Sequence, residues 1–202
     1  GDVYKRQILS LLISVLITGA FHEDGLADVC DGFGGGWDKV KIMSIMKDSS
    51  IGTYGAIGLI ILFSLKIGLL VDIYSKMPSL SIFLVTITGH SLSRFIATTF
   101  LFTHQYARTS HDSKAKDLIL APKKSILLVG GIFGLLPLFG LSYCVGNYLV
   151  LLLIFPCYLI KYLLGRYFEK WVDGYTGDCL GATQQITEII FYLAFTGLWK
   201  FI

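Results

Sequence analysis

Six long apolar runs constrain the fold of this chain more than any other feature. The runs cover residues 8–21, 55–71, 80–102, 125–141, 147–164 and 186–202. A helix needs roughly 20 apolar residues to cross a bilayer. Only 15% of the 202 residues are charged, whereas a soluble domain averages about 25%. A soluble core of this size could not bury so many apolar helices. The sequence therefore predicts an all-α, polytopic helical membrane protein, one domain over 1–202 with about six transmembrane helices.

Other features of the composition exclude several kinds of site. The four cysteines form no Cys-x-x-Cys pair, so neither a zinc site nor a disulfide framework is expected. No basic patch is interleaved with aromatic residues, which argues against nucleic acid as a partner. Residues 1–7 fit none of the patterns that follow. We interpret them as a truncated or non-native edge without a role.

The distribution of lysine and arginine predicts the orientation in the membrane. Loops 22–54, 103–124 and 161–185 contain three, five and three of these residues, while segments 72–79 and 141–147 contain one and none. With six spans, the three basic loops lie on one face, which the positive-inside rule makes cytoplasmic. We therefore expect three polar segments, distant in sequence, to line one cavity on the cytoplasmic face of the membrane.

The stretch over residues 22–55 is acidic, although the chain has a net charge of +3. Asp24, Asp28 and Asp31 are spaced so that a helix would place them on one face. Like charges on one face repel, and carboxylate oxygens suit hard cations such as Mg²⁺ or Mn²⁺. A glycine-rich turn would bring Asp48 towards them. We predict that these four aspartates bind one or two divalent cations, which would hold a phosphoryl group. The alternative is a solvated acidic helix.

Further polar residues lie at or within the apolar runs. Ser49 precedes the second run, where it could cap a helix or face a phosphate. Lys66 lies near the end of that run and is expected to reach the membrane interface. Arg94 lies inside the third run, where an arginine usually faces a cavity; it would bind a substrate phosphate or pair with an aspartate. Asp178 lies before the last run and Glu188 lies inside its start. Glu188 is a candidate functional residue, because it is a carboxylate near the membrane interface.

Together these motifs resemble the signature of the cobalamin synthase family, the adenosylcobinamide-GDP ribazoletransferases. The matching residues are His22 to Asp28 with Asp31-Gly32, Ile45 to Ser49 with Gly52 to Gly55, Leu92-Ser93-Arg94, Tyr106-Ala107-Arg108, and Thr176-Gly177-Asp178 with Leu180-Gly181-Ala182. They run in order from about residue 19 to the last run, and the first two are highly specific. Family members usually carry a further N-terminal membrane segment, so we expect this chain to be short at its start.

The resemblance implies the last joining step of cobamide assembly, at a prokaryotic inner membrane. A hydroxyl of α-ribazole, or of its 5′-phosphate, attacks the phosphate attached to cobinamide in adenosylcobinamide-GDP, and GMP leaves; the family needs Mg²⁺. The resemblance makes Asp48 or His22 the base that deprotonates this hydroxyl, and Arg94 a group that neutralises phosphate charge. The implied substrate-binding residues are Lys47, Ser49, Ser93, Arg108 and Asp178.

Two other functions share some of these features. A CDP-alcohol phosphotransferase also uses an Asp-x-x-Asp-Gly opening, which Asp28, Asp31 and Gly32 match. That family carries an Ala-Arg shortly after this opening and ends its motif with Gly-x-x-x-Asp-x-x-x-Asp, and neither is found at the expected place in this sequence. A divalent-cation transporter would distribute carboxylates between repeats in mid-membrane, whereas here they cluster at one interface and no repeat is found. The sequence also allows a homo-oligomer.

Overall fold

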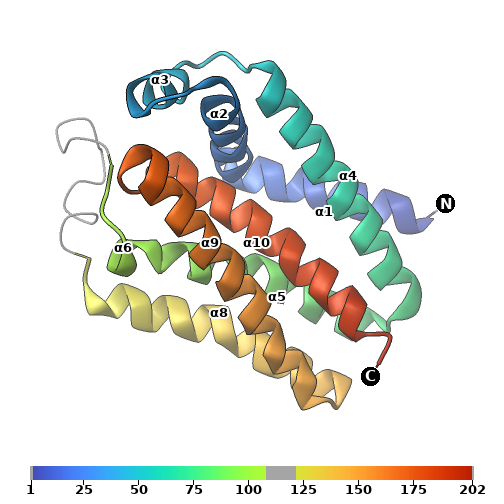
Figure 1. Cartoon of the computed structure of the whole chain (residues 1–202). Helices are drawn as coiled ribbons and strands as arrows, with labels where there is room; N and C mark the ends of the chain where they lie inside the picture. The colour runs from blue at the N-terminus through green and yellow to red at the C-terminus, as the bar shows by residue number, and fades with distance from the viewer. Residues whose placement is uncertain (1, 108–121, 202) are drawn as a thin grey trace.

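The structure, a computed structural model, describes residues 2–107 and 122–201, and these residues form helices without a β-strand (Figure 1). In chain order the elements are α1 (Asp2–Thr18), α2 (Phe21–Gly35), α3 (Lys39–Ile45), α4 (Thr53–Lys76), α5 (Ser79–Thr98), α6 (Phe100–Thr103), α8 (Lys124–Val145), the 3₁₀-helix η2 (Tyr148–Leu153), α9 (Ile154–Val172) and α10 (Gly177–Leu198). The predicted all-α fold is confirmed.

Four helical segments are long and apolar enough to cross a membrane: Thr53–Lys76, Ser79–Thr103, Lys124–Val145 and Tyr148–Val172. The pair α1 and α2 adds a fifth if its two helices, bent by 88°, count as one broken span. The number of spans among the described helices is therefore four or five, where the sequence predicted about six. The difference lies in the last apolar run, which belongs to α10.

Helix α10 lies inside the bundle rather than at its surface (Figure 1). Its apolar residues Phe191, Tyr192 and Phe195 are fully buried in a core cluster that also contains Leu92 and Ile96 of α5. Its middle turns also bury polar side chains, namely Thr183, Gln184, Gln185, Thr187 and Glu188. A helix that is polar in the middle and surrounded by protein does not need the composition of a lipid-facing span.

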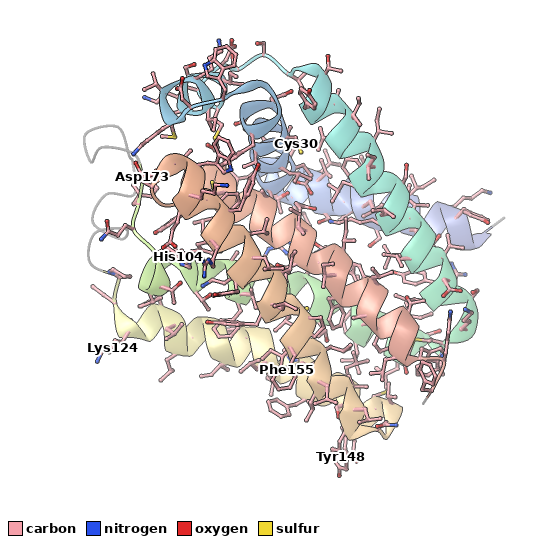
Figure 2. The ribbon with its side chains drawn as sticks, viewed as in Figure 1. Cys30, His104, Lys124, Tyr148, Phe155 and Asp173 are labelled. Atoms are coloured by element: carbon pink, nitrogen blue, oxygen red, sulfur yellow. The ribbon has the colours of Figure 1, made fainter. Side chains whose placement is uncertain are left out.

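The outer faces of the spanning helices are apolar. Ile60 of α4, Phe133 of α8 and Phe155 of α9 each expose more than half of the side chain, and Figure 2 shows Phe155 and Tyr148 pointing outward from the ribbon. An apolar surface this extensive is expected to face lipid rather than water. The protein is thus a membrane protein, as the sequence predicted.

A sharp bend separates α1 from α2. Gly19 and Ala20 both adopt left-handed backbone conformations, with φ of 63° and 58°. Glycine adopts this conformation without steric cost, whereas alanine does not. The bend ends the first helix and starts the acidic motif in a new direction. Helix α1 itself begins at Asp2, so residues 2–7 belong to the same helix as the first apolar run. Gln7 Nε2 donates to the Leu70 carbonyl oxygen at 3.3 Å.

Candidate active site

Three polar segments that are distant in sequence meet at one end of the bundle (Figure 1). Lys39 Nζ of α3 lies 3.0 Å from Asp173 Oδ2, just after α9. The Ala107 N–H donates to the Tyr175 carbonyl oxygen at 2.8 Å, and the Tyr175 N–H donates to the Gln105 carbonyl oxygen at 2.9 Å. These bonds join the segment after α6 to the segment before α10. The three segments therefore lie at one end of the bundle, whereas the expectation that they line one shared cavity stays a prediction.

A cavity of about 400 Å³ lies at this end, between α2 and the segment that leads from α3 to α4. Five of the predicted site residues line it together: Asp24, Asp28, Lys47, Asp48 and Ser49. Chain reversal after α2 brings the two segments together, and it occurs after Gly35, where the helix ends. The structure thus unites the two most specific sequence motifs in one cavity.

Asp24 and Asp28 lie one turn apart on α2 and contribute carboxylates to the cavity wall. Asp24 is exposed and Asp28 is half-buried. Within the described part of the chain, no group of three or more His, Cys, Asp or Glu side chains is close enough to hold an ion. The four-aspartate cation site therefore stays a prediction.

Asp31 has a different position, because it caps the next long helix instead of lining the cavity. Its Oδ2 accepts the Gly52 N–H at 2.7 Å, and its Oδ1 accepts the Gly55 N–H at 2.8 Å. Gly52 is the N-cap residue of α4 and Gly55 lies in its first turn, where a negative charge is favourable. A Cβ atom at Gly52 or Gly55 would collide with this carboxylate. Asp31 thus supplies the helix cap that was one of the two roles considered for Ser49.

Asp48 is held in a tight turn at the cavity. Its Oδ1 accepts the Ser50 N–H at 3.0 Å and the Ser50 hydroxyl at 2.8 Å. These two hydrogen bonds hold the pKa of Asp48 below its usual value, so the side chain is ionised at neutral pH. A carboxylate with a lowered pKa is a weaker base but a good cation ligand. His22, the other predicted base, lies on α2 outside the cavity lining, with Nδ1 buried and unpartnered among the described residues.

The other predicted residues are not part of this lining, as far as the described residues outline it. Arg94 Nη1 donates to the His90 carbonyl oxygen of its own helix at 2.9 Å. Ser93 is buried and its Oγ accepts Gln184 Nε2 at 3.0 Å. Asp178 lies in the first turn of α10, at the N-terminal end of the helix that packs against α2. Arg108 lies outside the described residues.

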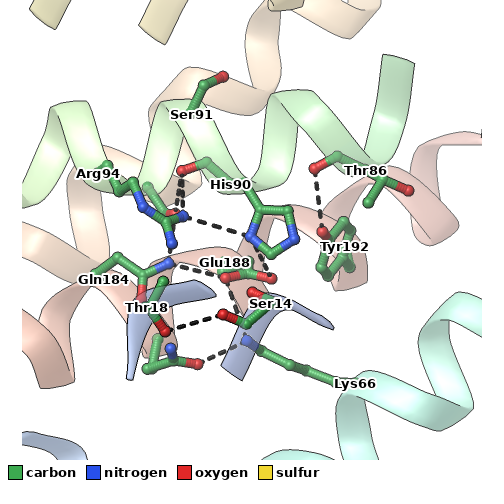
Figure 3. Close-up of polar contacts among 12 residues, drawn as sticks. Ser14, Thr18, Lys66, Thr86, His90, Ser91, Arg94, Gln184, Glu188 and Tyr192 are labelled. Atoms are coloured by element: carbon green, nitrogen blue, oxygen red, sulfur yellow. Dashed lines mark hydrogen bonds and ion pairs between the residues drawn. The ribbon is translucent and has the colours of Figure 1, made fainter. Parts of the chain in front are cut away.

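A buried polar network joins α4, α5 and α10 (Figure 3). Lys66 Nζ lies 3.2 Å from Glu188 Oε2 and donates to Gln185 Oε1 at 2.6 Å. His90 Nδ1 lies 3.4 Å from Glu188 Oε1. Lys66 is only 2% exposed, so the prediction that it reaches the membrane interface is wrong. Its ion-pair partner Glu188 lies on α10, and the attraction between the two charges offsets the desolvation cost of burying the ammonium group.

Comparison with known proteins agrees with these motifs. The sequence model of the family described as cobalamin-5-phosphate synthase matches residues 4–196. The chain belongs to this family. The adenosylcobinamide-GDP ribazoletransferase of Leptospira interrogans is 45% identical, over 96% of this chain and 73% of the relative. The enzyme of the same name from Shewanella frigidimarina is 44% identical, over 92% of this chain and 69% of the relative. No solved structure matches the chain.

In this member of the cobalamin-5-phosphate synthase family, the structure adds Glu23 to the predicted site. Glu23 lines the cavity but is only 6% exposed. Its Oε1 accepts Gln185 Nε2 at 2.9 Å, while its Oε2 is buried and has no hydrogen-bond partner among the residues that the structure describes. Glu23 thus connects the buried network to the cavity. The sequence contained a signal, because Glu23 lies inside the same motif as Asp24, but only the fold shows which way it points.

Proposed function

We propose that this chain transfers adenosylcobinamide phosphate from adenosylcobinamide-GDP to α-ribazole, or to its 5′-phosphate, and releases GMP. The observation that carries the proposal is the composition of the cavity. It places Asp24 and Asp28 of α2 opposite Lys47, Asp48 and Ser49, which come from a separate segment. The relatives named as ribazoletransferases align with 92–96% of this chain, and this alignment includes the whole acidic stretch.

The transfer makes one bond and breaks one. The ribazole hydroxyl oxygen forms a bond to the phosphorus attached to cobinamide, the bond from that phosphorus to the bridging oxygen of the diphosphate breaks, and GMP leaves with the electron pair. The hydroxyl proton passes to a base. Lys47 supplies positive charge at the cavity wall, where it stabilises the charge that develops on the phosphoryl oxygens. Ser49, exposed at the same wall, can donate a hydrogen bond to the diphosphate.

We infer that Mg²⁺, or Mn²⁺ in its place, is the cofactor. The cavity would otherwise place a negatively charged diphosphate against carboxylates of like charge. The residues present fit a hard cation: Asp24 and Asp28 offer oxygens, Asp48 is ionised, and Glu23 Oε2 is a buried oxygen without a partner among the described residues. Bound there, the ion would neutralise charge on the diphosphate. Both oxygens of Asp31 are already engaged by α4.

The proposal includes a location. The Lys- and Arg-rich loops of the sequence support a bacterial inner membrane with the active site on the cytoplasmic side. The lipid bilayer then surrounds the apolar faces of α4, α8 and α9. The cavity lies at the end of the bundle that carries these loops, where soluble nucleotide substrates would reach it.

The product distribution tests the function. Purified protein in detergent, given Mg²⁺, adenosylcobinamide-GDP and α-ribazole, should release one GMP for each cobamide formed, measured by chromatography and mass spectrometry. Chelation of divalent cations with EDTA should stop GMP release and cobamide formation, and added Mg²⁺ or Mn²⁺ should restore both activities. Consumption of a CDP-activated alcohol without GMP release would indicate the phosphotransferase alternative. Mg²⁺ flux into liposomes without turnover would indicate a transporter.

A further inference from the structure

A second cavity, of about 670 Å³, lies between α6 and the C-terminal half of α9. As outlined by the described residues, it shares no lining residue with the active-site cavity. Three cations of α9 line it, Lys161, Arg166 and Lys170, together with Thr103 and the carboxylate of Glu169. This lining has three positive charges and one negative charge, so the cavity attracts anions.

Lys161 is the buried member of this group. It is 2% exposed, and its Nζ donates to Thr103 Oγ1 at 2.7 Å. The ammonium group also lies 4.6 Å from the ring centre of Phe100 and 5.5 Å from that of Tyr158. Within residues 2–107 and 122–201, no carboxylate lies close enough to form an ion pair with it. A buried ammonium group in a cavity whose described lining carries a net positive charge favours an anionic ligand.

Among the described lining residues Glu169 supplies the single carboxylate, which offsets one of the three positive charges. It is about half exposed and lies 3.9 Å from His104 Nε2. Arg166 Nη1 donates to the Tyr162 hydroxyl at 3.2 Å, which leaves the remaining guanidinium N–H groups available for an anion. The His104 ring packs against Gly165 of α9, where a Cβ atom would collide with it (Figure 2). This contact holds α6 close to α9 and shapes the cavity.

The depth of the cavity indicates the source of the anion. Helix α9 belongs to the candidate span Tyr148–Val172, and the apolar run within it ends at residue 164. Tyr158 and Tyr162 lie before that point and are both about half exposed, while Arg166 and Lys170 lie after it. Tyrosines next to basic residues mark the membrane interface, and basic pockets between helices at this level bind anionic lipid head groups.

We propose that this cavity binds the phosphate of an anionic phospholipid of the surrounding membrane, with Lys161, Arg166 and Lys170 as its ligands. The proposal does not depend on the reaction at the other cavity. Helix α6 leads directly into Gln105, whose carbonyl oxygen accepts the Tyr175 N–H before α10. A lipid bound between α6 and α9 would therefore stabilise the junction at the active-site end of the bundle.

The test compares lipids on the purified full chain in detergent. Phosphatidylglycerol should be retained as one bound lipid in native mass spectrometry and should raise the thermal unfolding temperature, whereas phosphatidylcholine and inorganic phosphate at the same concentration should do neither. The double variant Arg166→Gln/Lys170→Gln changes mostly exposed side chains and should weaken phosphatidylglycerol binding by about tenfold or more. Lys161→Met should abolish it.

Lys76→Gln is the matched control, because Lys76 is a cation at the end of a different helix that pairs with Asp72. It should bind phosphatidylglycerol like the wild type. Three results would overturn the proposal: equal stabilisation by phosphatidylcholine, equal stabilisation by inorganic phosphate, or wild-type lipid affinity in the double variant. Because the double variant leaves buried Lys161 in place, a folding defect of Lys161→Met would not obscure the outcome.

Discussion

Removal of the Asp31 carboxylate should destabilise the fold, separately from any effect on catalysis. The side chain is 9% exposed, and it accepts two backbone N–H groups of α4, at 2.7 and 2.8 Å. Hydrogen bonds to a charged group contribute about 1.5–3 kcal/mol each. Water can replace the bond to Gly52, which is exposed, so we take the lower end, about 3 kcal/mol for Asp31→Ala. In a protein of this size, that lowers the unfolding temperature by about 6–12 °C.

Glycine variants of the same helix provide the matched comparison. Gly55→Ala should lower the unfolding temperature like Asp31→Ala, because its Cβ would occupy the place of the carboxylate. Gly68 lies on the same helix, and a Cβ added there has no described atom within 4 Å. Gly68→Ala should therefore leave the unfolding temperature unchanged or raise it slightly. Thermal unfolding in detergent, followed by circular dichroism, measures all three. If Asp31→Ala and Gly55→Ala unfold within about 2 °C of Gly68→Ala, the capping role is refuted.

Two further predictions concern the buried network and the cavity. Lys66→Met should destabilise the protein by about 3 kcal/mol or more, because it leaves the buried Glu188 carboxyl without its ion-pair partner. Lys66→Met/Glu188→Gln should recover part of this loss in a double-mutant cycle of unfolding, and strictly additive effects would contradict the pairing. Ser50→Ala should raise the pKa of Asp48 by removing one hydrogen-bond donor. A lowered pKa keeps Asp48 ionised as the pH falls. In this variant the rate of GMP release should therefore begin to fall at a higher pH than in the wild type. An unchanged acid limb of the pH–rate profile would exclude Asp48 from the reaction.

Local sequence patterns predicted the parts of the structure that depend on local forces. Apolar runs predicted the helices, because a chain in lipid must satisfy its backbone hydrogen bonds within each segment. The spacing of Asp24 and Asp28 correctly indicated one helical face directed at one cavity. The expected glycine-rich turn is instead the last turn of α2, which ends at Gly35. The chain reverses only after it, and Asp48 lines the same cavity as Asp24 and Asp28.

Partners at long range could not be predicted in this way. Lys66 looked like an interfacial lysine because its neighbours are apolar, and only the packing of α10 places Glu188 beside it. Asp31 looked equivalent to Asp24 and Asp28 on its helix, yet the start of α4 occupies both of its oxygens. The last apolar run looked like a sixth span, although its polar residues are buried by surrounding helices. In each case a tertiary contact decided the environment of the side chain.

The rate of GMP release by Asp28→Asn tests the central claim most directly. The change keeps the shape of the side chain and removes a negative charge from the wall of the active-site cavity. Asp72→Asn is the matched control, since Asp72 lies at the far end of α4 in an ion pair with Lys76. With both variants folded, as judged by thermal unfolding, Asp28→Asn should abolish GMP release from adenosylcobinamide-GDP and Asp72→Asn should leave it unchanged. GMP release by Asp28→Asn at the wild-type rate would contradict the assignment of this cavity as the active site.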